Sequence, residues 1–224
     1  MNLMRAFRKM AVDPFRYGMT SYDAERFWRD RHTKYGLALR GSGNEAWSEA
    51  DNKRQNDEDR VRLLGLLRVC GRPLGSGSVL EVGCGCGVYA DACQDAGISS
   101  YIGVDITDAL FPSLTQAHPE FRFVKRDCTK PGGLDLGARF DVVLAISVIE
   151  HITARPKLDA ALANMRRVLA DGGLLFVGPV SDAGGLRLFY HRVWREKDVL
   201  AGFDLCGRVS FRGGQLLALR AQAL

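Results

Sequence analysis

Residues 78–107 read SVLEVGCGCGVYADACQDAGISSYIGVDIT, and this stretch decides the fold. A short apolar strand runs into three alternating glycines, Gly83, Gly85 and Gly87, and a helical segment then leads to a second apolar strand, 101–105. Glycine permits a tight turn and lets a ligand approach the backbone, while the first turn of a helix offers N–H groups to an anion. The stretch therefore predicts a strand–loop–helix–strand unit whose loop binds a ligand.

The same alternation of strands and helices continues toward the C-terminus. Apolar runs predict strands over 78–83, 101–105, 121–127, 139–147 and 174–180, and the intervening segments predict helices over 88–97, 107–119 and 155–173. Such an order indicates a parallel sheet covered on both faces. Residues 203–222 then predict strand, turn and strand. The predicted fold class is α/β, a Rossmann-like, doubly wound, seven-stranded sheet that is mostly parallel and ends in a C-terminal antiparallel hairpin.

The predicted organisation has two parts, a basic and aromatic N-terminal arm or lid over 1–55 and a main domain over 56–224. The arm predicts a helix over 21–36 with Ser21 as its cap, followed by a polar loop over 39–55. An amphipathic helix then opens the domain. In sheets of this kind, ligands bind beyond the carboxyl ends of the strands, which is where we expect the chemistry.

The formal net charge of +5 is concentrated near the N-terminus. Residues 1–40 contain nine Lys and Arg against four Asp and Glu, so their balance of +5 equals that of the whole chain. The remaining 184 residues carry no net charge, which argues against a domain with a basic surface that binds nucleic acid. An anionic partner would therefore meet the arm.

Composition favours a soluble enzyme of the cytoplasm. Hydrophobic residues make up 46% and charged residues 25% of the chain, which are ordinary values for a globular enzyme. No apolar run approaches the roughly 20 residues that a membrane span needs, and the N-terminus lacks the apolar core of a secretory signal. The six cysteines follow no disulfide framework, which favours a reducing compartment.

Three further features specify what the glycine loop binds. Asp105 ends the second strand, 22 residues after the first loop glycine, where a carboxylate can accept hydrogen bonds from both ribose hydroxyls of a nucleoside. Asp127 ends the third strand, in place to meet an adenine amino group. The fourth strand delivers Ser147, Glu150 and His151 to the mouth of the site.

The loop is not a dinucleotide-binding fingerprint, because Val88 stands where the third glycine of that motif belongs. The lysine and the Ser or Thr of a phosphate-binding nucleotide loop are also missing. Glu81, two residues before the first glycine, suits a ligand with a positive charge. A methionine moiety with an ammonium and a sulfonium fits this acid better than a pyrophosphate does.

At this point the sequence resembles the class I S-adenosylmethionine-dependent methyltransferases. The matching segments, in the family's order, are VLEVGCGCG (79–87), YIGVDIT (101–107), FVKRDCT (123–129), FDVVLAISVIEHI (140–152) and VLADGGLLFVGPV (168–180). The resemblance implies S-adenosyl-L-methionine as the cofactor. The cofactor-binding residues that it implies are Glu81, Gly83, Cys84 and Gly85 in the methionine-binding loop, Asp105 at the ribose, Ile106, Asp127 and Cys128 around adenine, and Ile146 and Ser147 near the sulfonium.

Two sequence patterns suggest a metal-binding site, but each lacks some of the side chains that such a site needs as ligands. Cys84 and Cys86, even with Cys93, have no matching Cys or His pair elsewhere to complete a tetrahedral site. The Glu-His pair at 150–151 resembles the divalent metal site of some RNA 3′-end methyltransferases, but Ser147 stands in place of their first glutamate. We therefore expect no metal.

His151 and Glu150 are the candidate catalytic residues. A neutral imidazole suits removal of a proton from a hydroxyl or an amine, although a histidine that only shapes the pocket also fits the sequence. Methyl transfer depends strongly on alignment, since holding the acceptor in line with the sulfonium supplies much of the rate.

The aromatic side chains of the arm predict a lid over the cofactor and acceptor, in which Arg31 or Arg40 meets a carboxylate or phosphate. The alternative is an arm that packs its aromatic rings on the domain surface. The lid residues are Tyr22, Phe27, Trp28, Tyr35 and Trp47, and further candidates for the acceptor pocket are Tyr190, His191 and Trp194.

The sequence thus predicts a methyltransferase acting on oxygen or nitrogen of a small, anionic metabolite or glycan intermediate. One alternative is an RNA methyltransferase, which would show metal dependence and salt-sensitive RNA binding. Another is a non-catalytic cofactor-binding protein of the same fold. The sequence names neither the acceptor nor the oligomeric state, because the fold fixes the donor far better than the acceptor.

Overall fold

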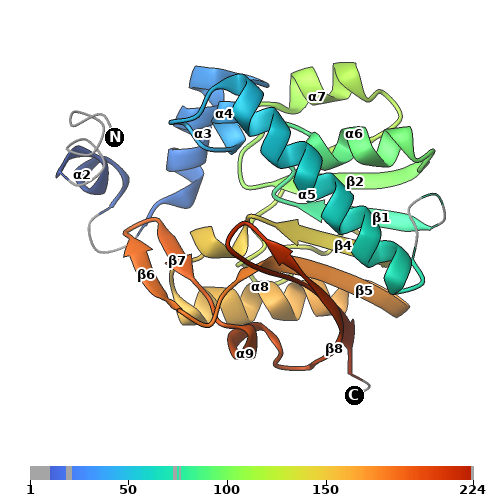
Figure 1. The fold of residues 1–224 in the computed structure, drawn as a ribbon. Helices are drawn as coiled ribbons and strands as arrows, with labels where there is room; N and C mark the ends of the chain where they lie inside the picture. The colour runs from blue at the N-terminus through green and yellow to red at the C-terminus, as the bar shows by residue number, and fades with distance from the viewer. Residues whose placement is uncertain (1–10, 19–21, 73–74, 76, 223–224) are drawn as a thin grey trace.

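A seven-stranded sheet forms the centre of the molecule in the computed structural model, which describes residues 11–18, 22–72, 75 and 77–222 (Figure 1). Its strand order is β3-β2-β1-β4-β5-β9-β8, and β6 and β7 form a separate two-stranded sheet. The strands are β1 (Ser78–Val82), β2 (Ser100–Asp105), β3 (Arg122–Lys125), β4 (Phe140–Ile146), β5 (Leu169–Val180), β6 (Gly185–Leu188), β7 (His191–Val193), β8 (Phe203–Phe211) and β9 (Gly214–Ala221).

Helices cover both faces of this sheet (Figure 1). The helices of the described residues are α2 (Asp13–Tyr17), α3 (Ala24–Tyr35), α4 (Leu39–Ser42), α5 (Glu49–Val69), α6 (Val88–Asp95), α7 (Phe111–Ala117), α8 (Arg155–Arg167) and α9 (Glu196–Val199), with the 3₁₀ helix η2 (Ile149–His151). The strands β3, β2, β1, β4 and β5 pair in parallel, while β9 pairs antiparallel with both β5 and β8. The predicted doubly wound sheet with a C-terminal hairpin is therefore confirmed.

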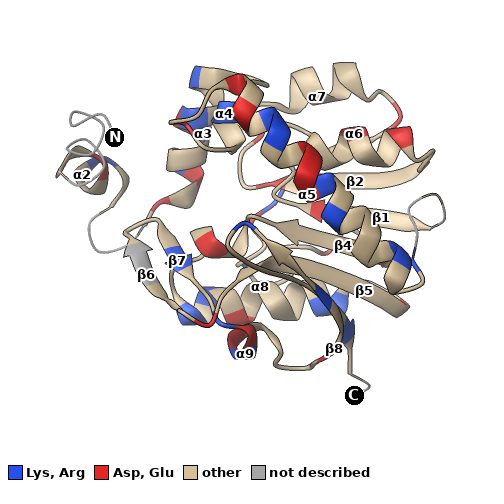
Figure 2. Cartoon of the chain, viewed as in Figure 1, with Lys and Arg blue, Asp and Glu red and all other residues tan. Residues whose placement is uncertain are grey.

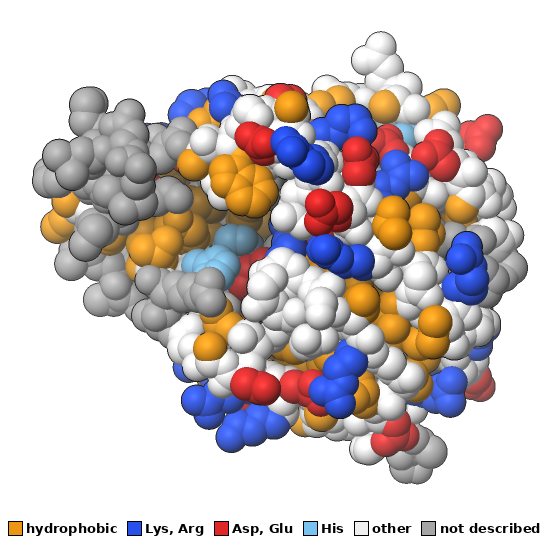
Figure 3. Space-filling view, in the orientation of Figure 1, with side chains coloured by type: hydrophobic (Ala, Val, Ile, Leu, Met, Phe, Trp, Pro, Cys, Tyr) orange, Lys and Arg blue, Asp and Glu red, His pale blue; other side chains and the backbone are white. Residues whose placement is uncertain are grey.

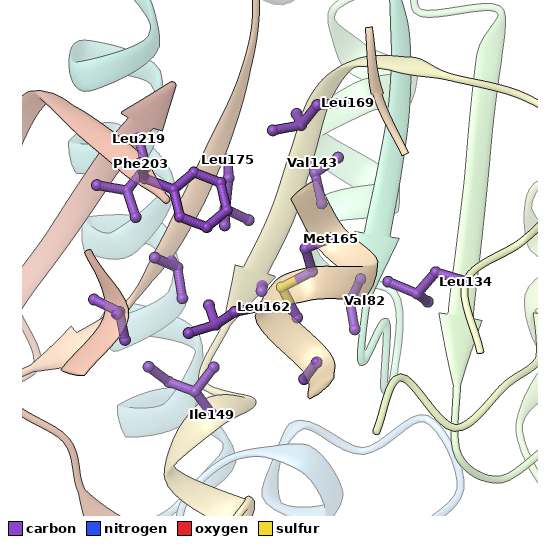
Figure 4. Close-up of a cluster of buried hydrophobic side chains, with 14 of the residues drawn as sticks. Val82, Leu134, Val143, Ile149, Leu162, Met165, Leu169, Leu175, Phe203 and Leu219 are labelled. Atoms are coloured by element: carbon purple, nitrogen blue, oxygen red, sulfur yellow. The ribbon is translucent and has the colours of Figure 1, made fainter. Parts of the chain in front are cut away.

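Two hydrophobic clusters explain why the strands are continuous apolar runs. Alternate residues of each strand point to opposite faces, and both faces are covered. On one face Leu80, Val143 and Leu175 pack with Met165 of α8, in the cluster drawn in Figure 4. On the other face Val79, Val142, Leu144, Leu174 and Phe176 pack with Leu63 and Leu67 of α5 and Tyr89 of α6.

The prediction of a loop over 39–55 was wrong at both ends, because α4 spans Leu39–Ser42 and α5 begins at Glu49. Ser48 caps the helix by accepting a hydrogen bond from the Asp51 N–H at 3.0 Å. The first turns carry charges of both signs (Figure 2), including the ion pair between Lys53 and Asp57 at 2.7 Å. These turns have no apolar face, so the periodicity that identifies a helix starts only farther along the chain. The helix also runs through the boundary predicted at residue 55.

The connection after β5 also contains regular secondary structure. It forms the hairpin β6–β7 and the short helix α9. Leu188, Phe189 and Tyr190 join an aromatic cluster with Tyr17 and Phe27 of the arm. Bulky side chains on consecutive positions can reach both sides of a hairpin, and this long-range contact with the arm outweighs local helix propensity.

Three smaller differences concern the ends of elements. The helix predicted over 155–173 ends at Arg167, because buried Leu169 already belongs to β5. The helix predicted over 107–119 is reduced to α7. Ser21, the predicted cap of the arm helix, lies outside the described residues, and Asp23 caps α3 by accepting the Arg26 N–H at 3.0 Å. Among the described helices, none has both the length and the apolar character to cross a membrane.

Candidate active site

A cavity of about 560 Å³ opens at the carboxyl ends of the parallel strands. Its wall combines α3 and α4 of the arm with the loops that follow β1, β2, β3 and β4. Figure 3 looks into a hollow on this side of the molecule, in which histidine side chains lie beside hydrophobic ones. Concave, enclosed sites of this size are typical of small-molecule and cofactor binding.

The glycine loop forms the floor of the cavity and is tied to the end of β2. The N–H groups of Gly83 and Cys84 both donate to the Val104 carbonyl oxygen, at 2.7 and 3.1 Å. The Gly85 N–H donates to Asp105 Oδ2 at 3.0 Å. Gly83, Gly85 and Gly87 all have positive φ, a backbone that favours glycine. At these three glycines the loop therefore exposes bare backbone to a ligand.

The acids predicted at the strand ends lie around this floor. Glu81 is buried and accepts a hydrogen bond from the Tyr101 hydroxyl, and burial raises its pKa to about 8. Burial raises the pKa of Asp105 to about 6, against the opposing effect of the Gly85 and Thr107 N–H groups. Burial thus makes the ionised form of both carboxyl groups less favourable. A ligand with a positive charge or with hydroxyl groups would stabilise that form.

The end of β3 contributes the third predicted acid. Asp127 Oδ1 accepts hydrogen bonds from the Thr129 N–H at 2.9 Å and from the Thr129 hydroxyl at 2.7 Å, which fixes the carboxylate in the loop. Ile106 and Cys128 line the same part of the cavity. The structure therefore brings the ribose and adenine candidates to one end of a single space.

At the end of β4, Ile146 and Ser147 line the cavity next to the glycine loop. Ser147 has a φ of 57°, and its N–H donates to the Gly178 carbonyl oxygen at 2.7 Å. Its hydroxyl oxygen is buried and has no hydrogen-bond partner within the described part of the chain. A buried polar atom without a partner in a cavity wall is a position where a ligand can satisfy it.

The two catalytic candidates differ in position. His151 lines the cavity, and its Nδ1–H donates to the Tyr190 carbonyl oxygen at 3.0 Å, which leaves Nε2 as the acceptor of the ring. Burial, followed by the nearby His191, lowers the pKa of His151 to about 3, so the ring is neutral at physiological pH. Glu150 is buried outside the cavity wall, its Oε2 has no partner among the described residues, and burial raises its pKa to about 7.

The arm covers the cavity through α3. Tyr22, Trp28 and His32 line it, and the rings of Trp28 and His151 meet edge to face at a centroid distance of 4.9 Å. Arg31 and Arg40 do not line the cavity. Arg31 Nη2 donates to the carbonyl oxygens of Arg40 and Gly43, at 2.9 and 2.6 Å, and Arg40 donates to the Trp47 carbonyl oxygen at 3.1 Å. These arginines hold the arm together, which the sequence could not indicate.

The other candidates for the acceptor pocket, Tyr190, His191 and Trp194, lie outside the cavity wall. Trp194 is buried and its indole N–H donates to the carbonyl oxygens of Ile149 and Ile152, at 2.9 and 3.0 Å. Tyr190 stacks on Phe27 at a centroid distance of 5.0 Å. Neither these residues nor His191 is among the side chains that line the cavity. They position η2 and α3 rather than the acceptor itself.

Several wall residues were not predicted. Ser42 of α4 accepts the Cys86 N–H at 3.1 Å, and Val148 lies over Gly83. Tyr89, Thr129, Lys157 and Arg212 also line the cavity. Only Arg212 carried a usable signal, because an arginine in the turn RGGQ occupies a position where glycine or asparagine is usual.

Within the described ranges, no group of three or more His, Cys, Asp or Glu side chains is arranged to hold a metal ion. Cys84 is buried, and burial raises the pKa of its thiol well above the ordinary value. Cys86 and Cys128 line the cavity as protonated thiols, because burial raises the pKa of each as well. The cysteines of the loop thus act as small side chains in a confined space.

Comparison with known proteins shows which domains the chain is similar to. Residues 80–175 match the family model described as a methyltransferase domain. This span starts within β1 and ends within β5, so it includes the glycine loop and the predicted acids at the ends of β1, β2 and β3. This part of the chain is therefore similar to methyltransferase domains, which agrees with the class I S-adenosylmethionine-dependent methyltransferases that the sequence resembles.

Curated relatives match part of the chain. It is 32% identical over 105 residues to the ubiquinone biosynthesis O-methyltransferase of Bradyrhizobium sp. (strain ORS 278), a match that covers 46% of this chain and 40% of that protein. It is 32% identical over 126 residues to the probable non-canonical nonribosomal peptide synthetase CymA of Salinispora arenicola, covering 54% of this chain and 2% of that protein. The chain thus matches less than half the length of either relative.

Solved structures share the fold over most of the chain. The magnesium protoporphyrin IX methyltransferase ChlM from Synechocystis PCC 6803, with bound SAM, is 20% identical with a TM-score of 0.63, covering 90% of this chain and 99% of that one. The N-methyltransferase NodS from Bradyrhizobium japonicum WM9 is 20% identical with a TM-score of 0.60, covering 76% and 97%. At these identities the likeness establishes a common architecture.

Gly83 should tolerate a methyl group poorly. A Cβ there would collide with Val148 Cγ2, whereas a Cβ at Gly97, which has the same φ of 74°, meets nothing within 4 Å. We expect Gly97→Ala to cost about 1–2 kcal/mol through backbone strain alone. Gly83→Ala should cost roughly 1–3 kcal/mol more through the collision. Urea unfolding measures both losses, and Val148→Ala in the Gly83→Ala background should recover part of the difference. Equal losses at the two glycines would show that Val148 does not press on the loop.

Glu81 should make the stability of the ligand-free protein depend on pH. Its pKa is about 8 in the folded protein against an ordinary value of 4.5, so its stabilising contribution is complete below pH 4.5 and is lost as the pH rises toward 8. Glu81→Gln cannot ionise. Its free energy of unfolding should therefore rise relative to wild type between pH 5 and 8, by up to ~1.4 kcal/mol per pH unit.

The measurement is urea unfolding of both proteins at four pH values, because the difference between them cancels the other titrating groups. Glu120→Gln, which alters an exposed carboxylate, is the matched control. A difference between Glu81→Gln and wild type that stays constant across this range would contradict the raised pKa.

Proposed function

We propose that this protein is an S-adenosylmethionine-dependent methyltransferase that transfers a methyl group to oxygen or nitrogen of a small, anionic acceptor. The observation that carries the proposal is the single cavity whose wall contains Glu81, the loop 83–86, Asp105, Asp127 and Ser147 together. The relatives support both kinds of acceptor atom, since one is named an O-methyltransferase and one structural neighbour an N-methyltransferase.

The residues of the wall fit S-adenosylmethionine. The glycine loop and α4 approach each other so closely that a Cβ at Gly85 would lie 2.7 Å from Ser42 Oγ, which keeps this part of the wall bare backbone. Asp105 keeps acceptor capacity for ribose hydroxyls beyond the two N–H groups that it binds, because a carboxylate has about four lone-pair sites. Ser147 offers an unpaired hydroxyl near the expected sulfonium. When bound, S-adenosylmethionine supplies an activated methyl group.

His151 is proposed to orient the acceptor. Its Nδ1–H is committed to the Tyr190 carbonyl oxygen, so Nε2 can accept a hydrogen bond from an acceptor hydroxyl or amine. The low pKa keeps Nε2 unprotonated, and it also limits how tightly the ring holds a proton. We therefore expect the side chain mainly to orient the acceptor by this hydrogen bond, and to a lesser extent to take up the acceptor's proton. Trp28 packs edge to face against the ring and restricts its motion.

Glu150 is proposed to act indirectly, because it is buried and does not line the cavity. Its peptide is part of the 3₁₀ turn that carries His151. Removing its carboxyl by Glu150→Gln should change catalysis through the position of His151, which predicts a smaller effect than substitution of His151. A larger effect would argue for a direct role of the carboxyl group.

The anionic character of the acceptor is supported by three exposed cations of the cavity wall, Arg126, Lys130 and Lys157. In this proposal these three residues, and not Arg31 and Arg40, attract the carboxylate or phosphate of the acceptor. Asp23 and Glu25 of the arm lie in the same wall, so the cations surround only part of it. A screen in which only neutral or cationic compounds are methylated would remove this part of the proposal.

A cytoplasmic location is part of the proposal. All six cysteines are free thiols in the structure, as a reducing compartment requires. Cell fractionation of the tagged protein tests this, and recovery outside the cytoplasmic fraction would contradict it.

The donor can be tested without knowing the acceptor. Calorimetric titration of the wild type with S-adenosylmethionine and S-adenosylhomocysteine should give micromolar binding, while NAD should not bind. Asp105→Ala should weaken binding about tenfold or more, because it removes an acceptor of charge-assisted hydrogen bonds from the ribose. Asp108→Ala, at an exposed position three residues away, is the matched control.

Absence of binding to the wild type would contradict the proposed donor. Tight binding without methylation of any compound in a broad acceptor screen would instead favour the non-catalytic cofactor-binding protein.

The role of His151 can be tested once a methylated acceptor is found. His151→Asn keeps a donor for the Tyr190 carbonyl oxygen but lacks Nε2, so we expect kcat/KM to fall by roughly 10²–10⁴. Affinity for S-adenosylhomocysteine should change less than about threefold, because His151 is not expected to touch the donor. His191→Asn, which alters a neighbouring histidine outside the cavity wall, is the control. An unchanged kcat/KM would leave His151 with a purely structural role.

A further inference from the structure

Two non-glycine residues of the described chain have left-handed backbone conformations, Ser147 with a φ of 57° and Arg212 with a φ of 47°. Both line the cavity, although they come from different parts of the sheet. A left-handed conformation costs a non-glycine residue roughly 1–2 kcal/mol. Strain of this kind persists where the surrounding structure holds it, and it is concentrated at ligand-binding sites.

The turn that contains Arg212 does not itself require an arginine. Phe211 pairs with Gly214 across the hairpin β8–β9, so Arg212 and Gly213 are the two turn residues, with φ values of 47° and 75°. Positive φ at both positions is the backbone of a type I′ turn, which favours asparagine or glycine. The side chain of Arg212 must therefore contribute something that the turn alone does not need.

The guanidinium of Arg212 is fixed by two residues of α5. Arg212 Nε donates to Asp59 Oδ2 at 2.6 Å, and Nη2 donates to Asn56 Oδ1 at 3.0 Å. The side chain of Asp59 is fully buried, and Gln55 donates to its other oxygen at 3.1 Å. A guanidinium is planar and rigid, so these two contacts determine where its remaining N–H groups point.

Arg212 still has donors to offer. A guanidinium has five N–H groups, and the described residues accept two of them. Asn56, Tyr89 and Glu81 line the same cavity as Arg212 does, and both Asn56 and Tyr89 interact with the guanidinium. The acidic groups that interact with the guanidinium are Asp59 and Glu150, both buried. The remaining donors therefore face a confined space in which a carboxylate could accept two of them side by side.

The position of Arg212 indicates which part of a ligand it would meet. Its neighbour Phe211 packs in the hydrophobic cluster of α5 and α6, on the face of the sheet to which the glycine loop leads. Ile149 and Ile152, which flank His151, pack on the opposite face with α8. Arg212 is thus on the side of the loop 83–86, where the amino-acid end of the donor is expected, and away from the acceptor side.

We propose that Arg212 is a positioning residue that binds the carboxylate of the amino-acid end of S-adenosylmethionine from the C-terminal hairpin, with Asp59 and Asn56 holding its guanidinium in place. This inference rests on the proposed function. It makes the last hairpin of the chain part of the donor site. The strain at Arg212 is then explained, because only a residue in that turn brings a guanidinium both to α5 and to the cavity.

The test compares S-adenosylmethionine with decarboxylated S-adenosylmethionine, which keeps the amine and the sulfonium and lacks the carboxylate. In calorimetric titrations the wild type should prefer S-adenosylmethionine by about tenfold or more, since a bidentate contact between charged groups is lost with the carboxylate. Arg212→Gln should bind both compounds with affinities within about threefold of each other. Arg212→Lys, which keeps the charge but not the planar fork, should retain part of the preference.

Arg208→Gln is the matched control. Arg208 lies in β8 of the same hairpin, pairs with Glu196 at 2.9 Å and is exposed, so its substitution should leave the preference unchanged. Thermal unfolding of each variant separates loss of fold from loss of recognition. If Arg212→Gln does not fold, Arg212→Lys and Asp59→Asn provide the same comparison, and both should reduce the preference.

The outcomes distinguish this inference from the proposed function. A wild type that binds neither compound overturns both. A wild type that binds S-adenosylmethionine, with Arg212→Gln weakening both compounds equally, assigns Arg212 to a structural link between the hairpin and α5 and overturns the inference alone. An unchanged preference in Arg212→Gln also overturns it.

Discussion

The turn after β1 is the constraint on which the rest of the site depends. The N–H groups of Gly83 and Cys84 share the Val104 carbonyl oxygen, so the ends of β1 and β2 are tied together at the backbone. Because Gly83 has no side chain, Val148 can lie directly over the loop and bring the segment after β4 against it. The wall of the cavity, including Ser147 and the turn that carries His151, follows from this close approach. A larger residue at that one position would separate the two halves of the site.

Desolvation determines the charge state of the wall. It raises the pKa of Glu81 to about 8 and lowers that of His151 to about 3, because burial disfavours the charged form of an acid and of a base alike. Near neutral pH, the Glu81 carboxyl group and the His151 imidazole of the wall are therefore mostly uncharged. A ligand that brings positive charge would stabilise the ionised form of Glu81. The neutral imidazole of His151 keeps a lone pair available to accept a hydrogen bond. This arrangement suits a cationic donor and an acceptor that presents a hydroxyl or an amine.

Segments from opposite ends of the chain complete the cavity that the central domain begins. The arm helix α3 covers it with Trp28, which packs against His151, and the C-terminal hairpin reaches it with Arg212, which is anchored to α5 through Asp59. The glycine loop and strand-end acids between them belong to the part that matches the methyltransferase domain. The matched part thus provides the glycine loop and the strand-end acids, while the added segments contribute Trp28 and Arg212 to the cavity wall.

Sequence reasoning was most successful where structure depends on neighbouring residues. The parallel sheet, the glycine turn and the acids that end β1, β2 and β3 follow from apolar runs and from residues a few positions apart. The tertiary structure decided what long-range contacts control. It committed Arg31 to carbonyl oxygens of the arm, turned the segment after β5 into a hairpin, and paired Arg212 with Asp59, 153 residues away. An arginine has the same local pattern whether it binds a ligand, a carbonyl or a carboxylate. Only the folded chain determines which of these partners lies within its reach.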